Sequence, residues 1–250
     1  MPIIFTLGKF QVFTFGLFLA LGFILSSFVV FYFGREDLKE EEYMDAFVYS
    51  SLMALFGARL MYVLTHFADF GGNILRYIVV REEPGLSLFG GLLGGTIFLW
   101  YYTKRRKIEF IRLADIFSVA FSFGLSIVSF GSFIGGGTYG AESFLPVGVK
   151  VVEQSSFIHP VELYQGIILL ILFILLATLL KTFFRRKEGL VSLVFLLGLS
   201  VSIFLLEFLK SIHVYLYYQI TFNHLISFSL FSACIVYILY LMYRRKKGIK

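Results

Sequence analysis

The chain has 250 residues, 58% of them hydrophobic, and a mean hydropathy of +0.86. A typical soluble domain has about 45–50% apolar residues, so the composition excludes a soluble globular protein and indicates a polytopic membrane protein. The net charge of +6 does not indicate a nucleic-acid-binding protein, because the basic residues fall in short clusters at the ends of apolar segments.

Seven apolar segments are long enough to cross a bilayer as helices of about 20 residues. They cover residues 12–33, 44–67, 86–103, 112–134, 160–184, 189–209 and 221–243. We therefore predict an all-α integral membrane protein of seven transmembrane helices. Because no linker or soluble segment interrupts the pattern, residues 1–250 are predicted to form a single polytopic domain.

The basic residues predict the orientation of these helices. With the N-terminus outside, sixteen of the 22 lysines and arginines fall in cytoplasmic segments and five fall outside, and Arg59 lies within the second span. Cytoplasmic loops of membrane proteins carry an excess of positive charge. We therefore predict an external N-terminus and a cytoplasmic C-terminus.

Two of the ionisable residues inside the predicted spans are the most informative. Arg59 is in the second span, and Glu207 is in the sixth, where Lys210 shares its helix face. An ionisable residue at the bilayer centre costs about 2.5–3.5 kcal/mol unless it is paired or hydrated, so function is the default interpretation of such residues. The alternative is an Arg59–Glu207 ion pair that only holds two helices together.

The segment between the fourth and fifth spans is rich in glycine. Five glycines fall within ten residues, at positions 131, 135, 136, 137 and 140. Each costs a helix about 1 kcal/mol relative to alanine, and backbone freed at membrane depth must be buried in protein or line a wet cavity. The sequence therefore predicts a central lipid-facing cavity and a short external loop between spans four and five, residues 135–159, that closes it.

The fifth span begins with a His-Pro pair. Glu162 and Gln165 follow His159 and Pro160 and share one helix face. A histidine beside a carboxylate can accept a proton or donate to an anionic headgroup. The alternative is a helix N-terminus with Pro160 in its first turn and Glu162 at the positive end of the dipole, and spacing alone favours that alternative.

The sequence does not predict a metal site or a cofactor site. The single cysteine, Cys234, has no metal-ligating residues at suitable spacing, and we interpret it as a packing residue. No phosphate-binding loop, dinucleotide fingerprint or nucleophile elbow is present.

The order of the motifs resembles that of one enzyme family. The motifs are FGLFLALGF, GARLMYVL, LSLFGGLLGG, FGLSIVSFGSFIGGGTYG, HPVELYQ and GLVSLVFLLGLSVSIFLLEFLK. Each is weak alone, but all six occur in the correct order, and almost end to end the chain resembles the prolipoprotein diacylglyceryl transferases. These are bacterial inner-membrane enzymes that transfer a diacylglyceryl group from phosphatidylglycerol to the cysteine of a lipoprotein signal peptide.

The resemblance implies a multi-pass protein of the bacterial cytoplasmic (inner) membrane that acts in lipoprotein biogenesis without a cofactor. Its expected partners are phosphatidylglycerol, a prolipoprotein signal peptide and membrane lipid, and no nucleic acid. His159 and Tyr164 are expected to be catalytic and to handle the thiol proton or the headgroup. The residues expected to bind substrate are Arg59, Glu207, Gly140, Glu162 and Lys210, with Arg59 on the lipid phosphate and Glu207 orienting Arg59.

The chain departs from the family pattern at several signature positions. Ser129 and Ile203 stand where the family has arginines, and Phe89 stands where it has a histidine. One alternative is therefore a catalytically impaired family member that binds phospholipid or lipoprotein signal sequences. A second is a small-solute transporter that uses the Arg59–Glu207 pair, although the chain shows no internal repeat of the kind many transporters have.

Overall fold

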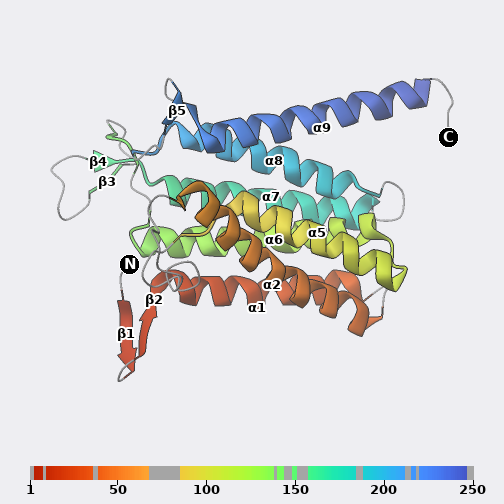
Figure 1. Ribbon diagram of the computed structural model, residues 1–250, viewed down its shortest axis with the longest axis horizontal. Helices are drawn as coiled ribbons and strands as arrows, with labels where there is room; N and C mark the ends of the chain where they lie inside the picture. Colours follow the sequence, from red (N-terminus) through yellow and green to blue (C-terminus); the bar gives the residue numbers. More distant parts are fainter. Residues whose placement is uncertain are drawn as a thin grey trace. The chain divides into compact units, whose positions relative to one another are not determined.

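The computed structural model describes ten segments of the chain. They are residues 3–7, 10–35, 39–67, 85–137, 140–143, 148–150, 157–183, 188–211, 215–217 and 220–246. Long helices dominate these residues (Figure 1). The helices are α1 (Thr14–Gly34), α2 (Glu40–Thr65), α5 (Leu88–Arg106), α6 (Phe110–Ile134), α7 (Val161–Phe183), α8 (Leu190–Glu207) and α9 (Phe222–Lys246).

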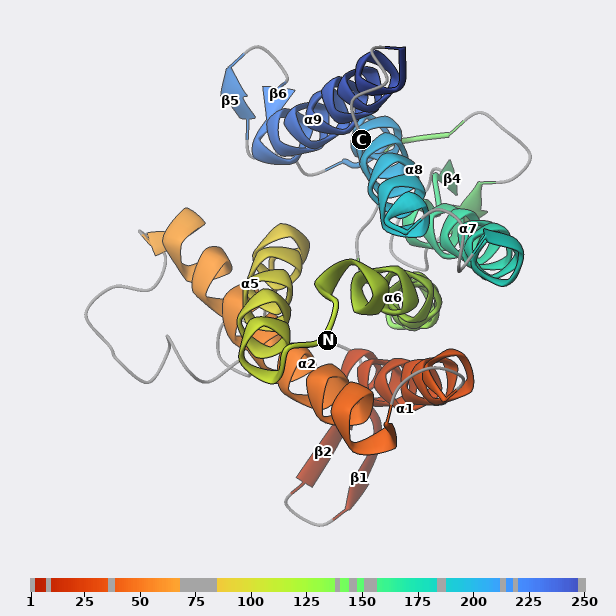
Figure 2. The same cartoon turned by 90° about the vertical axis from the view of Figure 1, so that its right-hand side faces the viewer.

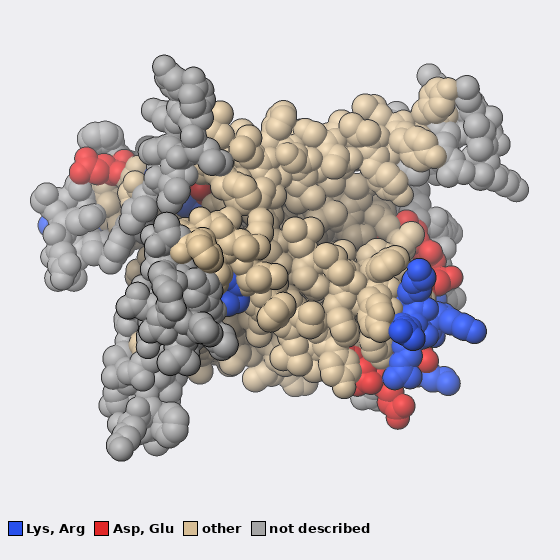
Figure 3. All heavy atoms as spheres, viewed as in Figure 1, with Lys and Arg blue, Asp and Glu red and all other residues tan. Residues whose placement is uncertain are grey.

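The prediction of a helical membrane protein is confirmed. Six of these helices, all except α5, are long and apolar enough to cross a membrane. Glycines and a basic last turn, Lys104, Arg105 and Arg106, make α5 less apolar. Figure 3 shows the same pattern, with acidic and basic side chains mostly at helix ends and few along the helix lengths on the face drawn. The seventh span stays a prediction.

Chain contacts divide the protein into two compact units. The first contains Met1–Val29 and Ser118–Lys250, and the second contains Val30–Phe117. We describe each unit by itself. The prediction of a single domain over residues 1–250 stays a prediction.

Within the first unit, α6 lies between α1 and α7 (Figure 2). On one side, the Ser26 hydroxyl donates to the carbonyl of Ala120 over 2.8 Å. On the other, Ser122 and Ser126 donate to carbonyls of α7, those of Leu169 at 2.9 Å and Gly166 at 2.8 Å. Serine is small enough to let helices approach closely, and its hydroxyl adds an interhelical hydrogen bond. These three serines therefore fix α6 against both neighbours.

Helices α8 and α9 complete the first unit. Gly198 of α8 leaves room for the Leu172 side chain of α7, which lies 2.9 Å from where a Cβ would be. Phe195 and Leu199 of α8 are buried. Helix α9 packs along α8 (Figure 1). The end of α8 and the start of α9 therefore lie close together, at the site described below.

The second unit is built on a close crossing of α2 and α5 (Figure 2). A Cβ on Gly57 of α2 would lie 2.6 Å from the carbonyl of Gly90 and 3.0 Å from the Cα of Gly94. Such contacts require glycine, because any side chain would separate the helices. Ser87 is the N-cap of α5: its hydroxyl accepts from the N–H of Gly90 over 3.3 Å, and its own N–H donates to the carbonyl of Ala58 over 3.0 Å.

Among the described residues, short strands precede α1 and lie in the segments between α6 and α7 and between α8 and α9. They pair as three antiparallel two-stranded sheets: β1 (Ile3–Leu7) with β2 (Phe10–Phe13), β3 (Val149–Lys150) with β4 (Phe157–Ile158), and β5 (Tyr215–Tyr217) with β6 (Ile220–Thr221). The second sheet belongs to the loop between α6 and α7. In that loop, residues 138–139, 144–147 and 151–156 lie outside the described residues.

Candidate functional site

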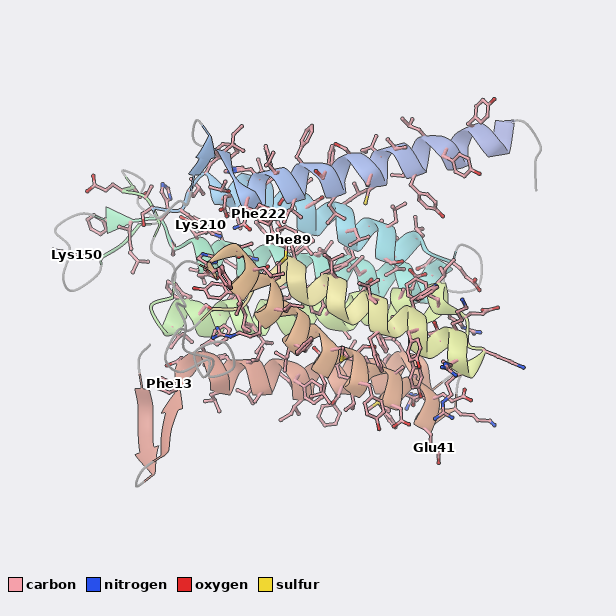
Figure 4. The ribbon with its side chains drawn as sticks, in the orientation of Figure 1. Phe13, Glu41, Phe89, Lys150, Lys210 and Phe222 are labelled. Atoms are coloured by element: carbon pink, nitrogen blue, oxygen red, sulfur yellow. The ribbon has the colours of Figure 1, made fainter. Side chains whose placement is uncertain are left out.

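A buried carboxylate lies at the end of α8. The Glu207 residue is 4% exposed, and its side chain accepts from three donors. The Lys210 ammonium donates to Oε2 over 2.8 Å, and the Thr221 hydroxyl and the Asn223 amide each donate to Oε1 over 3.0 Å. In Figure 4, Lys210 lies beside the start of α9, which Phe222 marks. This polar cluster connects the end of α8 to the start of α9.

The position of Glu207 explains why it needs these donors. Glu207 is the last residue of α8, where unsatisfied carbonyls carry partial negative charge and disfavour a carboxylate. Burial adds a desolvation penalty unless the charge is hydrogen-bonded and paired. An ammonium and two neutral donors meet both requirements, so the carboxylate has one defined orientation.

The glycine-rich loop contributes backbone to the same end of the unit. Gly140 pairs with Lys210 in an antiparallel bridge. The Ala141 N–H donates to the carbonyl of Leu209 over 2.7 Å, and the Ala141 carbonyl accepts from the N–H of His159 over 3.0 Å. Two neighbouring strand spacings amount to about 10 Å. The backbones of His159 and Leu209 are therefore held within about 10 Å of each other by Ala141.

Gly140 occupies a position that admits no side chain. A Cβ there would collide with the carbonyl oxygen of His159, which is backbone and does not rotate away. The sequence-based prediction treated Gly140 as a substrate-binding residue. In the structure, the absence of a side chain at Gly140 lets the loop backbone contact the backbone of His159, directly before the fifth predicted span.

His159 and Tyr164 lie together at the start of α7. The His159 Nδ1 is 3.5 Å from the Tyr164 hydroxyl oxygen, a long hydrogen bond, and the ring centroids are 6.2 Å apart. The backbone N–H of Tyr164 donates to the carbonyl of Pro160, so the helix begins directly after the His-Pro pair. Glu162 lies in the first turn and is partly exposed. This separation is longer than the roughly 2.6–3.2 Å over which a proton is transferred directly, so the two groups are neighbours rather than a closed proton-transfer pair.

Arg59 lies in the second unit, on α2. The residue is 9% exposed, and its Nη1 donates to the carbonyl of Gly85 over 3.2 Å. Its guanidinium carbon lies 5.8 Å from the centre of the Tyr62 ring, within the range of a cation–π interaction. The predicted Arg59–Glu207 pair would join the two units and stays a prediction.

The first unit thus brings together five of the seven predicted site residues. Backbone bonds and side-chain contacts connect Gly140, His159, Tyr164, Glu207 and Lys210 within one end of the unit. Glu162 shares the first turn of α7 with Tyr164. The chemical roles of these residues stay predictions.

Three of the positions that the resemblance marks as departures from the family pattern are buried. Ser129 on α6 is 6% exposed, Ile203 on α8 is 7% exposed, and Phe89 on α5 is 5% exposed. Ile203 precedes Glu207 by one helical turn, so the two residues share a face of α8. Within the described part of the chain, the Lys210 ammonium pairs with the Glu207 carboxylate.

Sequence reasoning missed Thr221 and Asn223. Both lie directly at the start of the last predicted span, and Thr221 also accepts from the N–H of His224 over 3.3 Å. That bond is an N-cap, because a threonine hydroxyl satisfies a free N–H of the first helical turn. A threonine ahead of an apolar run is a recognisable cap signal, but its second bond, to Glu207, is formed only by folding.

The fold and the site define a helical, multi-pass membrane protein with a polar cluster at the ends of α7 and α8. The chain belongs to the prolipoprotein diacylglyceryl transferase family, whose model matches residues 2–240.

Three relatives illustrate the similarity, and each bears the name phosphatidylglycerol–prolipoprotein diacylglyceryl transferase. The protein of Clostridium botulinum (strain Langeland) is 27% identical over 224 residues, covering 86% of this chain and 87% of its own. That of Clostridioides difficile (strain 630) is 28% identical over 208 residues, 83% and 82% of the two chains. The protein of Finegoldia magna is 26% identical over 204 residues, covering 81% of this chain and 80% of its own.

Proposed function

We propose that this protein transfers the diacylglyceryl group of phosphatidylglycerol to the cysteine thiol of a prolipoprotein signal peptide. The observation that carries the proposal is the family match over residues 2–240. The relatives named above bear this activity in their names and are matched over at least four-fifths of both chains. The conclusion is a membrane transferase of bacterial lipoprotein biogenesis.

The reaction needs a base and an anion-binding site. The thiol loses its proton, the thiolate sulfur attacks a glycerol carbon, and a C–S bond forms as the C–O bond to phosphate breaks. Glycerol phosphate leaves with the bonding electron pair. His159 is the proposed acceptor of the thiol proton, and Tyr164, whose hydroxyl oxygen lies 3.5 Å from its Nδ1, is proposed to orient the ring.

The leaving phosphate requires cations. Lys210 and Arg59 are proposed to bind it, since ammonium and guanidinium groups both form charge-assisted hydrogen bonds to phosphate. Lys210 stands at the same end of the first unit as His159. Glu162 is proposed to contact substrate from the first turn of α7, and Gly140 to keep the loop backbone close to His159.

The proposed topology has seven spans, with α5 as the seventh membrane-crossing helix. At 19 residues, α5 is about 28 Å long at 1.5 Å per residue, close to the hydrocarbon thickness of a bilayer. The N-terminus is proposed to lie outside and the C-terminus in the cytoplasm. A central cavity that admits lipid is proposed to be closed on the outside by the loop between α6 and α7.

A second candidate function is lipid or signal-peptide binding without turnover. Buried Ser129, Ile203 and Phe89 favour it, because none of them supplies the charge or proton-transferring group of the family pattern. Removing one electrostatic stabiliser of a transition state typically costs ~10²–10³ in rate. A binder would retain the fold and the lipid site and lose the chemistry.

Complementation separates the two functions. The gene is expressed in a bacterium depleted of its own transferase, and growth and the acylation of a reporter prolipoprotein are measured. Restored growth with acylated reporter supports the transferase. Membrane-inserted protein without acylation contradicts it and leaves the binder, which a phosphatidylglycerol-binding assay then tests. A His159→Ala variant, made at matched expression, is expected to abolish any rescue.

A further inference from the structure

The Glu207 carboxylate has more donors than an ion pair requires. Its Oε2 accepts from Lys210, and its Oε1 accepts from both Thr221 and Asn223. The donors on Oε1 come from the start of α9, so they fix the carboxylate from the far side of the ion pair. Because these donors are neutral, they orient Glu207 without competing with Lys210 for its charge.

The Lys210 ammonium has hydrogen-bond donors left for a ligand. A lysine ammonium has three donors, and among the described residues Lys210 uses one, toward Glu207. The Lys210 side chain is 21% exposed, whereas that of Glu207 is 5% exposed. The lysine side chain is therefore more accessible than the carboxylate with which it pairs, which suits an anion that arrives from outside the pair.

We propose that Asn223 and Thr221 are positioning residues that hold Glu207 and, through it, aim the Lys210 ammonium at the phosphate of an anionic phospholipid. A lysine side chain loses rotamer entropy when it is ordered, so a fixed carboxylate stabilises one ammonium position before the lipid binds. The inference rests on the proposed function in two respects, the lipid as substrate and Lys210 as a ligand of its phosphate.

The start of α9 thereby gains a role that the family pattern did not suggest for it. Thr221 also caps α9, so its loss changes the helix end as well as the cluster. Asn223 gives the cleaner test, because its side-chain amide donates to Glu207 and does not cap α9. Ser227, one turn further along α9, is a matched control: it is buried, and its hydroxyl donates to the carbonyl of Asn223 within the same helix.

The experiment compares Asn223→Leu, Asn223→Gln and Ser227→Ala in the full-length protein in nanodiscs. Binding of phosphatidylglycerol and of zwitterionic phosphatidylethanolamine is titrated, and turnover of phosphatidylglycerol with a prolipoprotein peptide is measured in parallel. Asn223→Leu is expected to weaken phosphatidylglycerol binding about tenfold and to lower kcat/KM by at least as much. Asn223→Gln, which keeps an amide, is expected to retain part of the affinity, and Ser227→Ala all of it.

The ratio of the two lipid affinities distinguishes positioning from packing. A misplaced cation lowers only the preference for the anionic lipid, whereas a packing defect weakens both lipids and leaves their ratio unchanged. An unchanged ratio in Asn223→Leu, or an equal loss in Ser227→Ala, overturns the inference. If the wild-type protein shows no turnover while Asn223→Leu still changes the ratio, the transferase proposal fails and the positioning role stands.

Discussion

At the residue scale, the site depends on close backbone contacts and on one buried, hydrogen-bonded carboxylate. Gly140 touches the carbonyl of His159, and Glu207 lies between Lys210 on one oxygen and Thr221 and Asn223 on the other. Each contact involves backbone or a buried charge, neither of which can move away at low cost. Single substitutions here are therefore expected to have larger effects than substitutions on lipid-facing surfaces.

Gly140→Ala is expected to destabilise the protein by about 1–3 kcal/mol, because the added methyl group overpacks a backbone contact. The melting temperature in detergent measures this change. Gly16→Ala is the control, because no atom lies within 4 Å of its added Cβ. This change is expected to leave the protein as stable or to stabilise it by up to about 1 kcal/mol, since alanine has a higher helix propensity than glycine. Equal melting temperatures for wild type and Gly140→Ala would contradict the close contact with His159.

Glu207→Gln and Lys210→Met are expected to be coupled. Each single change leaves the other charge without its ion-pair partner, so the double variant should be more stable than the sum of the two effects by about 0.5–3 kcal/mol. Unfolding in denaturant with all four proteins measures the coupling energy. Additive effects would show that the ion pair contributes nothing to stability.

A second double-mutant cycle measures the coupling energy between Arg59 and Glu207, which the sequence predicts to be a pair. Arg59→Leu and Glu207→Gln, alone and together, are unfolded under the same conditions. If the two side chains pair, the double variant is expected to recover stability lost in either single variant. If the stability changes of the two single variants simply add, Arg59 and Glu207 do not pair, and Lys210 alone is the ion-pair partner of Glu207.

At the scale of elements, small residues set the helix contacts. In the first unit, serines on α1 and α6 bond to carbonyls of neighbouring helices. In the second, Gly57, Gly90 and Gly94 let α2 and α5 touch through their backbones. Lipid tails are as apolar as leucine, so packing and hydrogen bonds must hold membrane helices together.

Gly57→Ala is expected to separate α2 from α5 and to destabilise the second unit by about 1–3 kcal/mol. The atoms nearest the added Cβ are backbone atoms of Gly90 and Gly94, which have no side chain to rotate away. Gly91→Ala is the matched control, because its nearest neighbours lie 3.3 Å and 3.4 Å away. Thermal unfolding of both variants tests the crossing, and a larger loss for Gly91→Ala would contradict it.

At the scale of the whole molecule, charge placement predicts how the chain lies in the membrane. Sixteen of the 22 lysines and arginines fall on the predicted cytoplasmic side, including the basic last turn of α5. That turn carries Lys104 and Arg105 over the rings of Trp100 and Tyr101, at 4.9 Å and 5.4 Å from the ring centres. Aromatic and basic residues together are typical of a membrane–water interface.

A reporter fused after Lys250 is therefore expected to be cytoplasmic, and one inserted in the loop of residues 141–154 is expected to be external. Paired fusions that are active on only one side of the membrane, such as a phosphatase and a fluorescent protein, measure this directly. A cytoplasmic signal from the loop would contradict both the orientation and the external closure of the proposed cavity.

The sequence alone determined the class of protein, most helix positions and the family. These follow from local properties: apolar runs of about 20 residues must be helical in lipid because their backbone polar groups find no other partners, and the six ordered motifs carry the resemblance. It also singled out Glu207 and Lys210 through their helical spacing and Gly140 through the glycine-rich loop.

Only the tertiary structure decided which groups meet. Thr221 and Asn223 are separated from Glu207 by 14 and 16 residues, and their bonds exist because α9 turns back along α8. Ala141 contacts both Leu209 and His159 because the loop between α6 and α7 pairs with the segment that follows α8 and with the segment that precedes α7. Periodicity reports which face of one helix a residue occupies and nothing about the neighbouring chain segment, so the donors of a buried carboxylate are fixed by packing.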